Sequence, residues 1–316
     1  MQPVRRIVLA GVILLGTLCA FIIPGTPMVS RAHANESGAH PGLWKYLAFR
    51  GNHFLGKVNT EVFLADLPAN EAQKILISIP QGSPLEASTP RVLVIDVQSK
   101  VAPLLGAIDL SGSQAWFSPD DATALQRIRS RRGDDIWQNT YRFSPQGVYR
   151  VRKKPARAEE KKLSPEHWNR IKTTFYPYPP LNPESGPVLE PAGLLYLASF
   201  LDVGSQTASR RLYVFDRKQL HEVRMDVEGR RRLKVSYLEK GHQQEVQRDG
   251  MIDAVKISFK PRALIAQGQP PEQFSFMGLR GDFDIYLDPA NRIPVQISGQ
   301  ISRIGQIHIR LQIVEF

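Results

Sequence analysis

Most of the chain after residue 43 alternates apolar and polar residues in short runs that turn-forming residues separate. Successive side chains of a β-strand point to opposite faces, so this pattern predicts an antiparallel sheet with one dry and one wet face. In the last run, polar Gln306, His308 and Arg310 alternate with isoleucine and leucine. We expect short strands at residues 43–49, 55–64, 75–79, 92–98, 104–110, 137–143, 148–153, 211–215, 220–227, 232–238, 252–259, 281–287, 293–301 and 305–313.

Helical signals are few. A helix is predicted at 119–131, where Asp120 and Asp121 follow a proline, and a second begins at Ser164 with Pro165 in its first position. The second would carry Trp168, Ile171 and Phe175. The third, at 191–201, is apolar over much of its circumference, which is typical of a buried helix.

Residues 150–190 differ in composition from the segments on either side. The first part, RVRKKPARAEEKK, is highly charged, and the later part is crowded with proline and aromatic residues. We expect a charged, proline-rich insert, solvated in its first part and extended over the surface in its second. The remainder of 35–316 is predicted to form a single β-rich domain.

The first 34 residues have the three parts of a secretory signal. Arg5 and Arg6 precede an uncharged apolar stretch at 7–23, and the triplet ending at Ala34 suits cleavage. We expect a periplasmic protein cleaved after Ala34; the alternative is an inner-membrane anchor formed by the same segment. Cys19, the only cysteine, lies inside the apolar stretch and is interpreted as a small hydrophobic residue rather than a lipid-attachment site.

The balance of charge is basic. The chain has 41 Lys and Arg against 30 Asp and Glu, and the signal contains three of the arginines and no acid. The mature protein therefore keeps a positive charge that suits contact with an anionic membrane surface. Nucleic acid is not an expected partner of an exported protein.

Catalytic and cofactor motifs are not found. The sequence has no Gly-x-Ser-x-Gly elbow, zinc helix, phosphate loop or dinucleotide fingerprint, so we expect no cofactor and no metal. A glycan hydrolase is the weakest alternative. It rests on four carboxylates near tryptophans, which are more simply explained as helix-start and turn residues: Asp120, Asp121, Asp134 and Asp135.

Two groups of residues are candidates for binding. Basic runs on one face would make a cationic patch for anionic headgroups, with Arg150, Arg152, Lys153, Arg210 and Arg211 as contacts. The apolar helix either fills the core or leaves a dry cleft for an acyl chain. Leu194, Leu197, Phe200, Tyr213 and Phe215 would line that cleft.

Most of the mature chain, and its second half most clearly, resembles a known family. The segment LLYLASFLDVG, the strands RRLYVFDRKQLHEVRMDVEG and RLKVSYLE, and the closing 283–310 hairpin are similar to the domain-of-unknown-function 3108 family of bacterial envelope proteins. That family is grouped with the lipoprotein carriers LolA and LolB. The resemblance implies a mainly β fold, in which a curved antiparallel sheet forms an incomplete barrel around an apolar helix.

The leading hypothesis is a non-enzymatic envelope protein that binds a hydrophobic or lipid-like ligand in this half-barrel. The alternative is a scaffold or interaction protein in envelope assembly, which would bind envelope proteins and fill the cavity with its own side chains.

Overall fold

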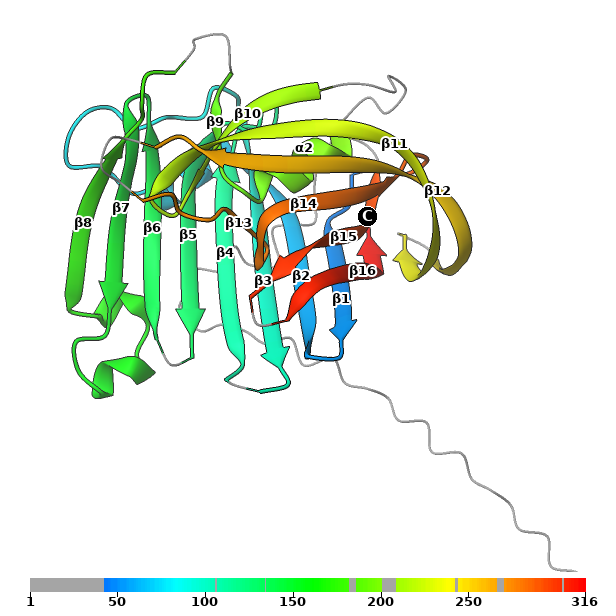
Figure 1. Cartoon of the computed structure of the whole chain (residues 1–316). Helices are drawn as coiled ribbons and strands as arrows, with labels where there is room; N and C mark the ends of the chain where they lie inside the picture. Colours follow the sequence, from blue (N-terminus) through cyan, green and yellow to red (C-terminus); the bar gives the residue numbers. More distant parts are fainter. Residues whose placement is uncertain are drawn as a thin grey trace, which may run out of the picture.

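The computed structural model of the protein describes residues 43–105, 107–133, 135–181, 186–200, 209–241, 244–265, 270–302 and 304–316. The fold is mainly β, as predicted, with one large curved sheet that does not close into a complete barrel. The strand order is β8-β7-β6-β5-β4-β3-β2-β1-β16-β15-β14-β12-β11-β10-β9, with β13 paired to β14 (Figure 1).

The first half of the chain forms an antiparallel meander whose neighbours in sequence are neighbours in the sheet. Its strands are β1 (Tyr46–His53), β2 (Gly56–Pro68), β3 (Arg91–Pro103), β4 (Asp109–Phe117), β5 (Ala124–Arg132), β6 (Trp137–Ser144), β7 (Gly147–Lys154) and β8 (Arg170–Pro177). One helix, α1 (Ala69–Ile75), follows β2.

The second half contributes the remaining strands and the second helix. They are β9 (Val188–Leu189), α2 (Gly193–Phe200), β10 (Ser209–Asp216), β11 (Gln219–Lys240), β12 (Glu245–Ala263), β13 (Ser275–Phe276), β14 (Leu279–Asp288), β15 (Ile293–Ile301) and β16 (Gly305–Glu315). The two halves meet where β1 pairs with β16, so they belong to one continuous sheet.

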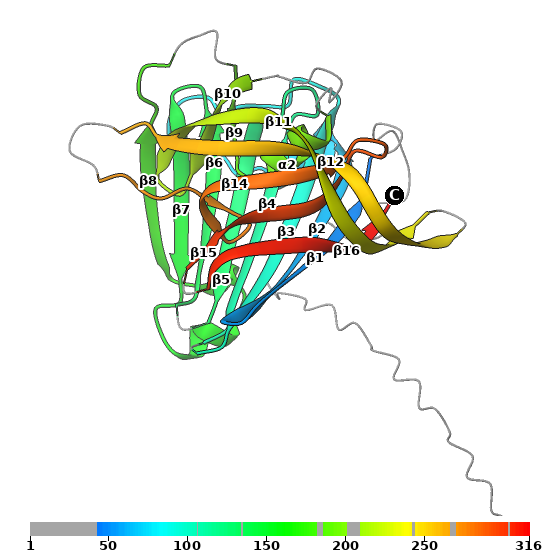
Figure 2. The ribbon, with the colours of Figure 1, turned by 45° about the vertical axis from the view of Figure 1, so that its right-hand side comes forward.

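The sheet curves so strongly that β10–β16 cross in front of β1–β8, with α2 between the two layers (Figures 1 and 2). We call the face of β1–β8 that turns toward the second half the inner face. Over β1–β4 this face is apolar and forms, with α2 and β11–β16, the largest hydrophobic cluster. The prediction of a curved sheet that holds an apolar helix is confirmed.

Two helix predictions were wrong. Most of 119–131 is strand β5, which pairs with both β4 and β6. Arg127, Arg129 and Arg131 alternate along it, and this period of two is the signal that outweighs the helical spacing of Leu125 and Ile128.

The predicted helix from Ser164 is only a 3-10 turn, Pro165–His167. Ile171 and Phe175 lie in strand β8, because Ile, Thr, Phe and Tyr favour extended backbone. The segment 150–190, expected as an insert, therefore supplies the end of β7 and all of β8 to the same sheet.

Two of the expected strands also differ from the structure. Residues 104–105 form an exposed turn between β3 and β4, so the strand expected at 104–110 begins only at Asp109. The strand expected at 75–79 is absent, because α1 occupies the preceding residues and the chain then crosses the outer face.

Helix α2 is where the sequence predicts it, within 191–201. The predicted signal segment, residues 1–34, lies outside the described residues. In the part of the chain that the structure describes, neither helix has the length and apolar character needed to span a bilayer.

Candidate functional site

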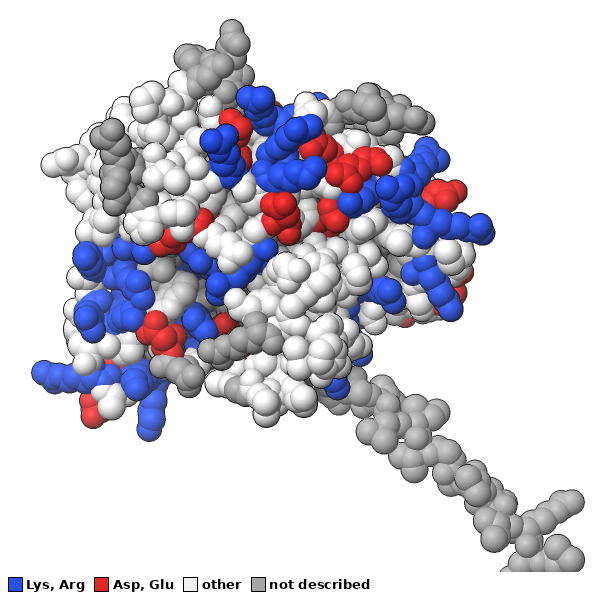
Figure 3. All heavy atoms as spheres, in the orientation of Figure 1, with Lys and Arg blue, Asp and Glu red and all other residues white. Residues whose placement is uncertain are grey.

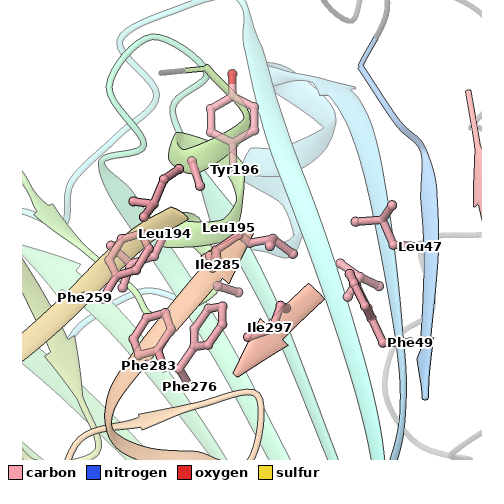
Figure 4. Packing of buried hydrophobic residues seen from close by; sticks show 14 of the residues in the cluster. Leu47, Phe49, Leu194, Leu195, Tyr196, Phe259, Phe276, Phe283, Ile285 and Ile297 are labelled. Carbon is pink, nitrogen blue, oxygen red and sulfur yellow. The ribbon is translucent and has the colours of Figure 1, made fainter. Parts of the chain in front are cut away.

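Helix α2 lies in a filled core. Leu194 is fully buried, and Figure 4 shows it with Leu195 among side chains from the opposing strands, such as Phe259 and Ile285. Leu197 and Phe200 are partly buried and pack against the same cluster. Trp44 donates a hydrogen bond from Nε1 to Ser199 Oγ (3.1 Å), which ties the start of the sheet to the helix.

Tyr213 and Phe215, the other two residues expected to line an acyl cleft, pack elsewhere. They belong to a second cluster with Tyr141 and Phe143 of β6, where the Phe143 and Phe215 rings meet edge to face. The five predicted residues are therefore divided between two packed clusters, and the structure does not bring them to one cleft.

A buried ion cluster separates the apolar core from the rest of the inner face. Arg127 Nη1 lies 3.2 Å from Asp216 Oδ1, and its Nε lies 3.5 Å from Glu190 Oε2. Asp216 also accepts a hydrogen bond from the backbone N–H of Ser275 (3.1 Å), while Glu190 accepts one from Gly193 at the start of α2. These contacts fix β5, α2 and the end of β10 to one another.

Burial dominates the electrostatics of this ion cluster. It raises the pKa of Glu190 and lowers the pKa of Arg127, since the charged form of each loses hydration. The charge of Arg127 lowers the pKa of Glu190, and the charge of Glu190 raises the pKa of Arg127, so each opposes the effect of burial on the other. The charge of Asp216 also raises the pKa of Arg127. An ion cluster so deeply buried is a structural element, and it leaves no cation free for a ligand at Arg127 itself.

Beyond this ion cluster, the inner face of β5–β8 carries a row of cations. Residues that face each other across antiparallel strands share one face of the sheet, and the register places Arg129 opposite Asn139 and Asn139 opposite Arg152. The pairings of β4 with β5, of β6 with β7 and of β7 with β8 place further cations on the same face. We call the set Arg129, Arg131, Arg150, Arg152, Lys154, Arg170 and Lys172 the cationic wall.

Aromatic rings hold the arginines of this wall in place. The guanidinium groups of Arg129 and Arg152 both lie 5.8 Å from the centre of the Trp137 ring, and that of Arg150 lies 5.0 Å from Tyr176. Such contacts orient a guanidinium without neutralising it, so its N–H groups stay available to an anion.

Carboxylates neutralise only part of the positive charge of the wall. Asp109 forms a bidentate pair with Arg131, Asp135 contacts Lys154 (2.7 Å) and Arg152 (3.9 Å), and Asp216 lies 3.7 Å from Arg129. Arg150 forms no ion pair with any described carboxylate, and β8 adds two exposed cations. The wall thus keeps an excess of positive charge.

Four polar atoms at the centre of the wall are buried without a hydrogen-bond partner among the described residues. They are Arg150 Nε, Arg152 Nε, Asn139 Oδ1 and Thr174 Oγ1. Thr174 stands directly opposite Arg150, and Asn139 directly opposite Arg152, so the four atoms come from adjacent register positions on three strands. Buried polar groups are normally paired, so these atoms call for a partner, a water or a ligand, that the described residues do not supply.

A small recess lies beside the wall. A cavity of about 50 Å³ lies between β3–β5 and the turn after β13, and its lining includes Arg127, Arg129, Ser99, Ser111 and Ser113. A single water needs roughly 10–15 Å³ of such space, so the recess has room for a few waters or one small anionic group. Ser113 Oγ already accepts a hydrogen bond from Arg127 Nε (2.9 Å).

The structure separates the predicted headgroup contacts. Arg150 and Arg152 belong to the wall, although Arg150 is only 7% exposed, whereas Lys153 points to the opposite face of β7. Arg210 and Arg211 are exposed on β10. In Figure 3, Lys and Arg gather in one group over β5–β8 and in others over β10–β12, so the predicted single patch is at least two.

The carboxylates proposed for a glycan hydrolase do not form one site. Asp121 accepts a hydrogen bond from the N–H of Thr123 in the turn before β5, and Asp135 pairs with Lys154 after β5. These turns flank a nine-residue strand, which spans about 30 Å, whereas glycosidase carboxylates lie roughly 5–10 Å apart. Asp134 lies outside the described residues.

Metal ligands do not cluster in the described part of the chain, where no three His, Cys, Asp or Glu side chains could share an ion. Sequence reasoning counted Arg129 among the basic runs and noted Trp137 beside the carboxylates, but it did not single out Asn139 or Thr174. The alternation of arginine at 127, 129 and 131 was the available signal, but reading it required β5 to be recognised as a strand.

Comparison with known proteins gives a fold-level likeness only. No family model matches the chain, and no curated protein matches it. One solved structure with a similar fold is a "beta-barrel-like protein of domain of unknown function DUF1849 from Brucella abortus", 8% identical, with a TM-score of 0.42 over 86% of this chain and 97% of that one. The expected resemblance to the 3108 family and the lipoprotein carriers finds no support in these comparisons.

Proposed function

We propose that this is an exported, non-enzymatic protein of the cell envelope that binds an anionic, lipid-like ligand by its headgroup at the cationic wall. The observation that carries this proposal is the group of four unpartnered buried polar atoms on adjacent positions of β6, β7 and β8, two of which belong to arginines. Phosphate and carboxylate groups accept the paired N–H bonds that guanidinium groups offer.

The geometry supports headgroup recognition rather than acyl-chain enclosure. The inner face around α2 is filled by fully buried side chains, including Leu194 and Leu195. The wall, in contrast, combines cations that are in part exposed with the recess beside Arg129. In this proposal the phosphate lies against Arg129, Arg150 and Arg152, and the acyl part of the ligand extends away from the wall toward the membrane surface.

The test is a binding titration with two soluble lipids of equal chain length. Dihexanoyl phosphatidic acid, below its micelle concentration, should bind the mature chain, and dihexanoyl phosphatidylcholine should bind at least about tenfold more weakly because its headgroup has no net charge. Binding should weaken with added salt, since the half-exposed cations are screened. Equal affinity for the two lipids would contradict the proposal.

The chain offers a matched control for charge. The double variant Arg129→Gln with Arg152→Gln should lose about tenfold or more in affinity for phosphatidic acid. The variant Arg210→Gln with Arg211→Gln removes the same net charge from the exposed start of β10 and should stay within about twofold of the unmodified chain. Equal losses in both variants would show nonspecific attraction to a basic protein.

Export is tested separately. Expressed with its own first 34 residues in a Gram-negative host, the protein should be found in the periplasmic fraction with a new N-terminus at Asn35. Retention in the membrane fraction with Met1 intact would support the alternative of an inner-membrane anchor.

The filled core around α2 also favours a second candidate, a scaffold in envelope assembly. Its contact surface would be the apolar tip made by two neighbouring turns, where Phe54 is 79%, Leu104 70% and Leu105 85% exposed. The turns are joined by a hydrogen bond from the N–H of Leu104 to the carbonyl of Leu55 (2.7 Å). Crosslinking in cells should then capture one defined protein, and Leu105→Ser should abolish the capture without changing lipid binding.

A further inference from the structure

Strands β11 and β12 form a long hairpin that leaves the main sheet. Their register shifts between Val227 and Arg230, where Gly229 has φ +86°, a conformation that glycine adopts without strain. Beyond this bulge the hairpin continues as an arm, residues 230–240 and 245–254, which no longer pairs with β14. The bulge therefore changes the direction of the hairpin and carries the arm away from α2 (Figures 1 and 2).

The tip of the arm returns to the sheet. Leu238, Glu239 and Lys240 pair in parallel with residues 313–315 of β16. The N–H of Phe316 donates to the carbonyl of Lys240 (3.2 Å), and Lys240 Nζ lies 3.4 Å from Glu315. The pairings of β11, β12, β14, β15 and β16 thereby complete a circuit of strands.

A cavity of about 330 Å³ lies between the arm and β15–β16. This volume is at the lower end of the range for small-molecule pockets, about 300–1,000 Å³. The cavity is partly open to solvent, and the parallel pairing at the tip joins the arm to the sheet at one end of it. The lining residues are Leu233, Lys234, Val235, Ser236, Tyr237, Val295, Gln296, Arg310, Leu311 and Gln312.

The lining of the cavity is amphipathic. Leu233 and Val235 on the arm are only partly buried, so apolar surface remains open to an occupant. The opposite side combines apolar Val295 and Leu311 with polar residues, and there Arg310 Nε donates to Gln296 Oε1 (3.2 Å). Burial raises the pKa of Tyr237 to about 12, so its hydroxyl remains a neutral donor.

The charges of the cavity have one sign. The ten lining residues include two cations, Lys234 and Arg310, and no carboxylate. Neither cation forms an ion pair with any residue that the structure describes. The cavity is therefore complementary to a molecule with one anionic group and an apolar body.

We infer that this arm cavity is a second binding site, separate from the cationic wall, for a small amphipathic carboxylate such as a medium-chain fatty acid. The carboxylate lies at Arg310, and the hydrocarbon chain packs against Leu233 and Val235 of the arm. Lys234 alternates with these two residues, so its side chain points to the other face of β11. The site does not depend on the proposed headgroup function, because it shares no residue with the wall.

The test uses decanoate labelled with ¹³C at the carboxyl carbon, observed by NMR with the full mature chain. Its resonance should shift and saturate on binding, while decanol, which has the same chain and no charge, should compete at least about tenfold more weakly. Arg310→Gln, which keeps the cavity open, should weaken decanoate binding about tenfold. Lys57→Gln, an exposed charge on β2, is the control and should have no effect.

A second variant tests the place of binding. Val235→Trp fills the cavity and should abolish the decanoate shift while the thermal unfolding midpoint stays close to that of the unmodified chain. The double variant Arg129→Gln with Arg152→Gln should bind decanoate normally even where it loses phosphatidic acid. Absence of saturable binding, or binding that survives both Val235→Trp and Arg310→Gln, would overturn the inference.

Discussion

The inner face of the sheet is a packed core over β1–β4 and a charged surface over β5–β8. At inward positions β2 has Val58, Val62 and Leu64, whereas β7 has Arg150, Arg152 and Lys154. The backbone pattern is the same in both regions, and the difference lies in the residue types and in what covers them. Helix α2 and β14–β16 cover the first, while the second keeps partly exposed cations and unpartnered polar atoms. We therefore propose that a single sheet supplies stability at one end and recognition at the other.

The comparison predicts that changes in the packed region reduce stability most. Leu195→Asp places an unpaired carboxylate at a fully buried position and should lower the free energy of unfolding by more than about 4 kcal/mol. Urea denaturation followed by circular dichroism measures the loss. Leu105→Asp is the matched control, because this leucine is 85% exposed, and it should change stability by less than about 0.5 kcal/mol.

At the border of the two regions, Arg127→Met should cost about 3–5 kcal/mol, because Glu190 would keep a buried charge without its partner and Asp216 would lose the nearest of its cations. Adding Glu190→Gln and Asp216→Asn should recover much of this loss. Thermal unfolding of the single and triple variants tests the point. A cost below about 1 kcal/mol for the single variant would mean that water reaches the cluster.

On the outer face, Asp96 should have a smaller effect on stability, and this effect depends on pH. Burial raises the pKa of Asp96 on β3 from 3.8 to about 6. A carboxyl group whose pKa is raised by folding binds its proton more tightly in the folded state. It therefore stabilises the fold at pH values below the pKa of the unfolded chain, and this contribution is lost as pH rises from about 4 through about 6. Asp96→Asn should therefore raise stability by about 1–3 kcal/mol at pH 8 and leave it unchanged at pH 3. Urea titrations at the two pH values provide the measurement, and an equal effect at both would contradict it.

Sequence reasoning reached the fold class because period-two alternation and the apolar helix are local signals, and both were confirmed. It failed at β5 and β8, where capping residues and prolines suggested helices and only the pairing of neighbouring strands decides the outcome. The cationic wall could not be predicted whole. Arg152 and Asn139 are thirteen residues apart in sequence and become neighbours only through the register of β6 and β7.

Replacement of an arginine of the cationic wall by a neutral residue should have the smallest effect on stability. It is also the sharpest test of the difference between the packed and the charged regions of the inner face. Arg152→Gln removes a half-exposed guanidinium whose contact with Asp135 is long, 3.9 Å, and whose Nε has no described partner. Such surface pairs contribute about 0–1 kcal/mol, so stability should change by less than about 0.5 kcal/mol. Binding of phosphatidic acid should nevertheless fall severalfold in a titration at low salt. A large loss of stability at Arg152, comparable with that at Arg127, would show that the wall is part of the structural ion cluster, and the distinction between the two regions of the inner face would no longer hold.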